Sequence, residues 1–211
     1  MTKVAIVDYS FGNLFNVQRA FKHLNIDACI TSKEEDLLRA ERIVLPGVGA
    51  FEEGMKHLKN NRLDEVLCGL ANKGRPILGI CLGMQILMSK SEEHGVCEGL
   101  NLIPGSVVYF SPPRDKEKFK IPQIGWNCIT SPSHSNWQGT IMEGVNQESF
   151  MYFAHSLYVV PDNSEDILCQ SEYGSNNFCS AVQRDNVMGC QFHPERSGET
   201  GIRILENFLN L

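Results

Sequence analysis

The chain lacks several features that would place it in other classes of protein. No apolar run among its 211 residues is long enough to cross a bilayer, and no apolar segment near its start resembles a secretory leader. Basic clusters are missing and the net charge is −6, so we expect no nucleic-acid partner. Internal repeats and low-complexity tracts are absent too. These absences indicate a globular protein with neither a membrane nor a nucleic-acid partner.

The eight cysteines do not form the pattern of a disulfide framework. No two of them have the C-x-x-C spacing, and they are scattered over the chain at Cys29, Cys68, Cys81, Cys97, Cys128, Cys169, Cys179 and Cys190. Scattered cysteines are typical of reduced thiols. We therefore expect a cytoplasmic protein.

Strand and helix patterns alternate in the first half of the chain. Apolar runs predict strands at residues 4–7, 27–31 and 42–45, and helical spacing predicts helices at 14–24 and 63–73. The sequence Ser32-Lys33-Glu34-Glu35 fits a capping box that opens a further helix. This order of elements implies a parallel sheet, with functional groups at the carboxyl ends of its strands.

After residue 105 the pattern changes to short strand-like runs separated by turn residues. The runs span residues 107–110, 124–130, 150–153, 167–170 and 178–183, and an amphipathic helix follows at the end. We predict an α/β fold in which one domain, residues 1–211, has a central, largely parallel sheet flanked by helices. A mixed or antiparallel strand extension should pack on the same core.

The segment Gly79-Ile80-Cys81-Leu82-Gly83 carries the strongest chemical signal. It follows an apolar run typical of a buried strand and precedes a helical stretch. A strand-to-helix elbow of this kind exposes a nucleophile at the top of a sheet, and the positive end of the helix dipole favours the thiolate. A lone cysteine is more often a buried structural residue, but the elbow favours a nucleophile.

A candidate base follows much later, in His193-Pro194-Glu195 at the end of an apolar strand pattern. Pro194 favours an extended backbone at His193, and Glu195 can then orient the imidazole. Thiol, imidazole and carboxylate are the parts of an activated nucleophile. Alone, a His-x-Glu sequence is more often a solvated turn; with the cysteine elbow it predicts a catalytic triad.

A glycine-rich turn follows the predicted strand at 42–45, in Pro46-Gly47-Val48-Gly49-Ala50-Phe51. Glycines after a strand let backbone N–H groups turn outward, as an oxyanion hole requires. Taken alone, the segment fits an ordinary tight strand-to-helix turn equally well.

These three segments together resemble the class I, or triad, glutamine amidotransferases. The similarity extends over essentially the whole chain. Further motifs, Ile124-Gly125-Trp126-Asn127 and Tyr152-Phe153-Ala154-His155-Ser156, are similar to those of the glutaminase subunits of imidazole glycerol phosphate synthases. The resemblance implies a flavodoxin-like fold, and it implies neither a cofactor nor a metal.

The resemblance also implies roles for individual residues, with glutamine as the substrate. Cys81 would attack the side-chain amide, His193 would transfer the proton and Glu195 would orient His193. Backbone N–H groups of Val48 and Leu82 would hold the oxyanion. The remaining groups of glutamine would be bound by Gly47, Gly49, Gln85, Glu93, Ser156 and Leu157.

A partner protein is implied as well. It would be a (β/α)8-barrel cyclase in a heterodimer, which uses the ammonia to make imidazole glycerol phosphate and aminoimidazole carboxamide ribotide in histidine biosynthesis. Ammonia is a nucleophile only while unprotonated, so an enclosed path to a docked partner is expected. The residues near the junction would be Asn13, Gln123, Tyr152 and Arg196, although each fits an ordinary surface residue equally well.

Four residues depart from the pattern usual in this family: Ser10, Gln123, Leu157 and Arg196. None belongs to the triad, and all gather where coupling to the partner is expected, so the identity of the cyclase stays open. One alternative is a paralogue that supplies ammonia through a cyclase-like partner to another acceptor, such as an amidino sugar of a surface polysaccharide. Another is a non-catalytic regulatory subunit.

Overall fold

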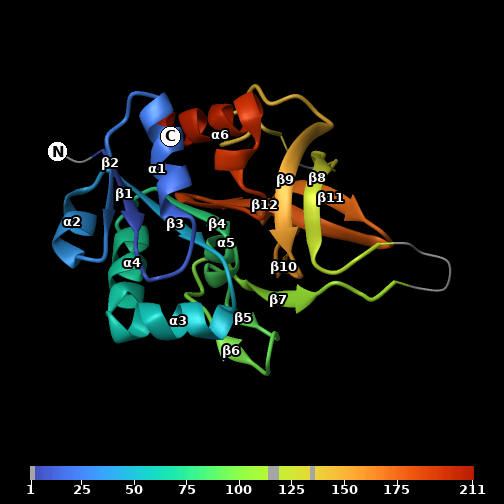
Figure 1. The fold of residues 1–211 in the computed structure, drawn as a ribbon, viewed down its shortest axis with the longest axis horizontal. Coiled ribbons are helices and arrows are strands. Elements are labelled where there is room, and N and C mark those ends of the chain that lie inside the picture. Colours follow the sequence, from blue (N-terminus) through green and yellow to red (C-terminus); the bar gives the residue numbers. More distant parts are fainter. Residues whose placement is uncertain (1–2, 114–118, 134–135) are drawn as a thin grey trace.

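A sheet of 11 strands forms the centre of the molecule (Figure 1). The computed structural model describes residues 3–113, 119–133 and 136–211. The main path of the sheet runs in the order β2 (Ala28–Thr31), β1 (Val4–Val7), β3 (Arg42–Gly47), β4 (Ile77–Cys81), β13 (Val187–Cys190), β12 (Asn176–Arg184), β10 (Leu157–Pro161), β7 (Gly105–Tyr109), β5 (Lys90–Ser91) and β6 (Cys97–Glu98). β11 (Ile167–Tyr173) pairs with β12 beside this path.

The sheet has a parallel part and a mostly antiparallel part. β2, β1, β3, β4 and β13 are parallel neighbours, in the 2-1-3-4-5 order of a flavodoxin-like sheet. From β12 onward, the strands β10, β7 and β11 pair antiparallel. The predicted fold, a largely parallel sheet with an antiparallel extension, is confirmed. β8 (Gln123–Ile129) and β9 (Ser149–His155) form a separate antiparallel ribbon.

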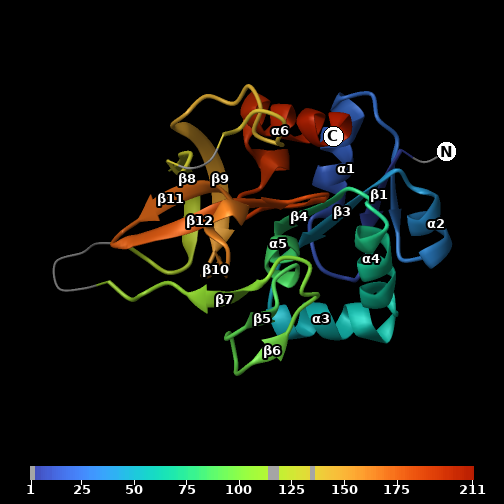
Figure 2. The same ribbon diagram turned by 180° about the vertical axis from the view of Figure 1, so that it is seen from behind.

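Helices cover both faces of the sheet, as Figure 1 and the reverse view in Figure 2 show. One face carries α1 (Leu14–His23) and α6 (Gly198–Asn210); the other carries α2 (Glu34–Arg39), α3 (Phe51–Asn60), α4 (Leu63–Asn72) and α5 (Leu82–Ile86). Because strand side chains alternate, Val4 of β1 joins the core under α1 and α6, whereas Ala5 joins the core of the opposite face. Within the described residues, no helix is both long and apolar enough to cross a membrane.

The start of one helix differs from the prediction. The capping box is wrong: α2 begins at Glu34, with Lys33 in the N-cap position and no side-chain cap. The side chain that holds the entry to α2 is Thr31 and not Ser32: its hydroxyl accepts the Lys33 N–H at 3.0 Å and donates to Asp36 Oδ2 at 2.7 Å.

Candidate active site

The carboxyl ends of β3, β4 and β13 meet at one edge of the sheet. β4 lies between the other two strands, with Gly47 opposite Cys81 in one ladder and Cys190 opposite Ile80 in the other. The glycine-rich turn, the cysteine and the segment after Cys190 are therefore neighbours, although they are far apart in sequence.

Cys81 occupies a strained strand-to-helix elbow. It ends β4 and is the N-cap of α5, with φ 56° and ψ −111°, a conformation that non-glycine residues rarely adopt. A Cβ on Gly79 would lie 2.7 Å from the backbone nitrogen of Met84, and one on Gly83 would collide with the Leu45 carbonyl. The two glycines therefore allow α5 to fold tightly back on the sheet, and the cysteine between them takes up the sharp bend.

The thiol is buried among polar groups from three segments. Cys81 is 5% exposed, and its side chain lies close enough to the imidazole of His193 to raise the pKa of that ring. Gln191 Nε2 lies 3.7 Å from the sulfur, and the Ala154 carbonyl oxygen lies 3.8 Å from it. The structure thus brings the predicted nucleophile and the predicted base together across the sheet.

His193 is held between the thiol and a carboxylate. Its Nδ1 lies 2.8 Å from Oε1 of Glu195, and both side chains are buried. Burial lowers the pKa of His193, but the hydrogen bonds and charges of Cys81 and Glu195 outweigh it and raise the pKa to about 10. That direction favours the protonated form of the imidazole. Ser197 Oγ donates to the His193 carbonyl at 2.7 Å and so fixes the backbone here.

A cavity of about 200 Å³ opens beside the sulfur. Its wall is formed by Val48, Gly49, Cys81, Leu82, Gln85, Glu93, Pro122, Ala154, His155, Ser156 and Leu157. Of the residues predicted to bind glutamine, all except Gly47 lie in this wall, and so do both residues predicted to form the oxyanion hole. Gly47 lies just outside it, at the end of β3.

Two polar side chains of the wall are held in place by neighbouring groups. Gln85 Nε2 donates to the Leu157 carbonyl and to Gln191 Oε1, both at 3.1 Å. Glu93 Oε2 accepts the Phe51 N–H at 2.6 Å, at the first residue of α3. Because a carboxylate has two acceptor oxygens, Glu93 can serve both α3 and an ammonium group of a ligand.

Three residues without a predicted role also border the thiol or the cavity: Gln191, Pro122 and Ala154. Gln191 is fully buried and connects Gln85 with Cys81. Its place two residues before the candidate base was the one available signal, since a strand alternates its faces and puts such residues on one side.

His155 also borders the cavity. Its Nδ1 lies 2.7 Å from the Leu157 carbonyl oxygen, so Nδ1 carries the proton. Burial, outweighing that hydrogen bond and reinforced by the nearby His193, lowers the pKa of His155 to about 4. The ring is therefore neutral at neutral pH.

The four residues predicted at a partner junction are not equally accessible. Asn13 is exposed at the N-cap of α1, and the exposed Arg196 guanidinium lies 4.0 Å from the centroid of the half-buried Tyr152 ring. Gln123 is only 2% exposed. It lies opposite His155 in the β8–β9 ladder, with its side chain directed inward.

Residues 5–211 match the model of the family "Glutamine amidotransferase class-I". The chain belongs to this family. The site described above therefore lies at the sheet edge of a class I glutamine amidotransferase.

Several similar proteins share a further name. The amidotransferase is 43% identical over 213 residues to imidazole glycerol phosphate synthase subunit HisH 1 of Legionella pneumophila (strain Paris), with 100% of both chains covered. It is 41% identical over 210 residues to subunit HisH of Geobacter sulfurreducens, covering 99% of this chain and 98% of the relative. The HisH subunit of Chlorobaculum tepidum is 40% identical over 205 residues, covering 97% of this chain and 98% of that protein.

Solved structures show the same fold at lower identity. PurLQS from Thermotoga maritima superposes on the amidotransferase with a TM-score of 0.72 and 20% identity, over 100% of this chain and 99% of that one. The glutaminase domain of Trypanosoma brucei CTPS with bound acivicin gives a TM-score of 0.63 at 16% identity, over 100% and 94% of the two chains. At these identities the similarity establishes the fold alone.

Proposed function

We propose that this amidotransferase is the glutaminase subunit of an imidazole glycerol phosphate synthase and acts in histidine biosynthesis. Similarity to the HisH subunits over the whole chain supports this role, and favours it over a paralogue that serves another acceptor. A cytoplasmic location is part of the proposal, and it is supported by the eight cysteines, all within the described residues and all free thiols. The main evidence for glutamine hydrolysis is the arrangement of thiol, imidazole and carboxylate beside a cavity.

In the first half of the reaction, the Cys81 thiolate attacks the side-chain amide carbon of glutamine. The C–N bond breaks, the His193 imidazolium gives its proton to the leaving nitrogen, and ammonia and a thioester form. Glu195 keeps the ring oriented through the 2.8 Å contact at Nδ1. Burial of all three groups strengthens these interactions because little water competes for them.

In the second half, water attacks the thioester and His193 takes its proton. Glutamate leaves, and the thiolate–imidazolium pair is restored, so that glutamine and water have become glutamate and ammonia. Backbone N–H groups of Val48 and Leu82 stabilise the oxyanion in both halves. Leu82 is the first residue of α5, where an N–H has no partner within the helix.

The remaining wall residues suit the two charged groups of free glutamine. The Glu93 carboxylate attracts the α-ammonium group, and Gln85 and the backbones of Gly49, Ser156 and Leu157 complete the wall. The backbone of Gly47, just outside the wall at the end of β3, completes the site. A cavity of about 200 Å³ suits a single amino acid, which fits a substrate that arrives free and not within a polypeptide.

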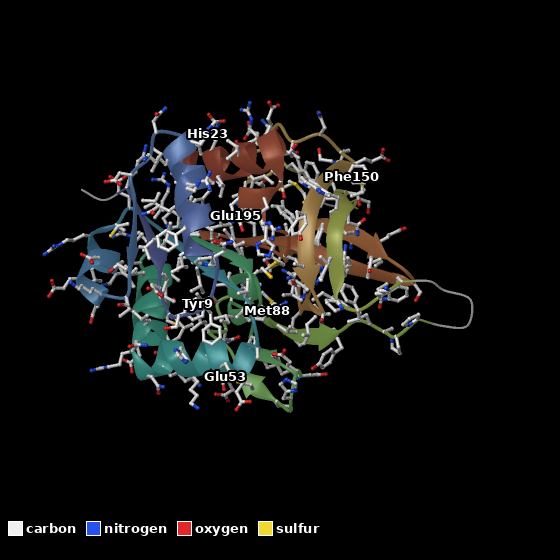
Figure 3. All side chains as sticks on the ribbon, viewed as in Figure 1. Tyr9, His23, Glu53, Met88, Phe150 and Glu195 are labelled. Atoms are coloured by element: carbon white, nitrogen blue, oxygen red, sulfur yellow. The ribbon has the colours of Figure 1, made fainter. Side chains whose placement is uncertain are left out.

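An exposed apolar surface on the β8–β9 ribbon is evidence for a docked partner protein. On the outward face of the β8–β9 ribbon, Ile124, Trp126 and Phe150 are 66%, 57% and 62% exposed. Figure 3 shows Phe150 on the outside of β9, while Glu195 lies in the interior. Apolar patches of this kind mark protein interaction sites. We assign the patch to the (β/α)8-barrel cyclase, because the same ribbon contributes Ala154 to the cavity wall and ammonia must reach the partner unprotonated.

The triad is tested by Cys81→Ala in the complex with the barrel cyclase encoded in the same genome. Glutamate release should fall to background, because no other thiol replaces the attacking sulfur. Cys29→Ala, on the distant edge strand β2, is the matched control and should keep parental turnover. Parental activity of Cys81→Ala would show that the assignment of the nucleophile is wrong.

The pathway is tested separately. The gene should restore growth without histidine to a strain that lacks its own histidine-pathway glutaminase, and failure despite good expression would contradict this role. We also expect the isolated chain to be a poor glutaminase that the cyclase activates. High turnover without the cyclase would contradict such gating.

A further inference from the structure

A buried phenol lies directly against the glycine-rich turn that follows β3. Tyr9 is 1% exposed, and Figure 3 shows it in the interior, on the side of the sheet covered by α3 and α4. Among the residues that the structure describes, none hydrogen-bonds its hydroxyl group. A phenylalanine would fill the same space without burying an unpaired hydroxyl, which costs free energy. We therefore expect this hydroxyl to find a hydrogen-bond partner in another conformation of the protein.

The position of the hydroxyl identifies the group that can become its partner. A Cβ on Gly47 would collide with the Tyr9 oxygen on one side and would lie 3.0 Å from Cβ of Leu82 on another. Gly47 thus needs to be glycine because the phenol occupies the space of a side chain. The hydroxyl is consequently within reach of the backbone at the start of the 47–49 turn.

Neighbours of Tyr9 pack on the same turn. A Cβ on Gly12 would lie 3.4 Å from the Pro46 carbonyl oxygen, and one on Gly49 would lie 3.3 Å from the Phe11 ring. The segment 9–12 therefore supports the turn along its length. Within that segment, Tyr9 alone offers a side-chain hydrogen-bond donor in the core.

We propose that Tyr9 is a positioning residue: its hydroxyl donates to a backbone carbonyl of the 47–49 turn when that turn directs an N–H at the oxyanion. The two groups of a peptide unit point in opposite directions, so an N–H aimed at the substrate sends its carbonyl away from it. A carbonyl turned into the core needs a donor, and Tyr9 supplies one. Burial, and to a lesser degree the charge of Cys81, raises the pKa of Tyr9, so the phenol keeps its proton. This inference rests on the proposed glutaminase function.

Tyr9→Phe tests the inference, because it removes the hydroxyl and keeps the packing. In the complex with the cyclase, kcat for glutamine hydrolysis should fall about tenfold or more, less than the roughly 100- to 1,000-fold loss of a direct oxyanion donor. KM should stay within about twofold, and alkylation of Cys81 by iodoacetamide should keep its parental rate. The melting temperature should not fall, because an unpaired buried hydroxyl is removed.

A matched control and the opposing outcomes make the test decisive. Ser171→Ala removes another buried hydroxyl without a partner, on β11 away from the cavity, and should leave kcat unchanged. A Tyr9→Phe variant with parental kcat would overturn the proposal. So would a fall in kcat matched by slower alkylation or by loss of the fold, since the hydroxyl would then serve packing. Failure of the proposed function itself is recognised separately, by a Cys81→Ala complex that still hydrolyses glutamine.

Discussion

Two strand-to-helix turns at the same sheet edge are built in opposite ways. The elbow from β4 to α5 is enclosed: Cys81 is 5% exposed, and Gly79 and Gly83 press against backbone atoms. The turn from β3 to α3 is open, with Val48 45% exposed and Gly49 at φ 104°. The first turn carries the proposed nucleophile and the second carries a proposed oxyanion donor.

This difference separates the parts of the site that need to be fixed from those that can be adjusted. The sulfur has to meet His193 at a set distance, and the ladder between β4 and β13 provides that. The donors need to be in place only when charge develops on the substrate. A protein that works with a partner can therefore regulate the open turn without disturbing the thiol.

The largest effect is expected at the enclosed elbow. Gly83→Ala forces a methyl group into the Leu45 carbonyl, and because backbone has to move, the variant should lose its cooperative unfolding transition. Gly69→Ala in α4 is the control, since among the described residues no atom outside the adjoining residues and the local helix backbone lies within 4 Å of the new methyl group. It should raise the free energy of unfolding by about 0.5–1 kcal/mol, measured by urea denaturation. A stably folded Gly83→Ala would show that the elbow is less constrained than its contacts indicate.

The next effect concerns the carboxylate behind the base. Glu195→Gln should lower kcat by about 10³- to 10⁴-fold, because an amide stabilises the imidazolium poorly and can select the wrong tautomer. Circular dichroism should show an intact fold. Glu199→Gln, an exposed carboxylate in the first turn of α6, should leave kcat unchanged. A loss of less than tenfold in Glu195→Gln would count against its orienting role.

A third prediction uses the neutral histidine of the cavity wall. The pKa of His155 is about 4, below the 6.5 of a free imidazole, so between these values the unfolded chain binds a proton that the folded chain does not. The contribution of neutral His155 to the free energy of unfolding should therefore be fully present above pH 6.5. It should decline towards pH 4 by about 3 kcal/mol, at 1.36 kcal/mol per pKa unit. The difference in stability between the parent and His155→Gln isolates this contribution. A difference that does not change with pH would contradict it.

The smallest effect is expected at the open turn. Gly49→Ala places a side chain at φ 104°, close to the Phe11 ring, which strains the turn by about 1–3 kcal/mol. The fold should survive, and kcat in the complex should fall about 10- to 100-fold while alkylation of Cys81 keeps its rate. If alkylation slowed as much as turnover, the two turns would not be independent.

The sequence predicts the parallel half of the fold and the segments of the proposed triad because those features depend on local order. The apolar runs before Gly47 and Cys81 identify strands, and the residues that follow each run fall at the same edge. α3 is not among the predicted helices: Gly54 lowers the helix propensity of a segment whose buried positions become clear only in the structure. The sequence pattern also predicted the wrong start for α2. Thr31, at the end of β2, accepts the Lys33 N–H, and Ser32 does not act as the predicted cap.

Other parts of the site depend on register between distant strands. The inward direction of Gln123 follows from its pairing with His155, and a shift of one residue would have exposed it. The contact between Gln191 and Cys81 likewise requires β13 to lie beside β4. A single sequence contains no signal for either pairing, so the contacts of these residues become visible only in the folded chain.

β13 is the last strand in the chain but lies fifth along a path of ten. While the protein is being synthesised, the strands on either side of that place are complete and their facing edges remain unpaired. Exposed edges of this kind invite pairing with other chains. Insertion of this one segment closes the gap and brings the imidazole to the sulfur in the same event. The newly made protein should therefore acquire its chemical activity and its resistance to aggregation together, and only after β13 has left the ribosome.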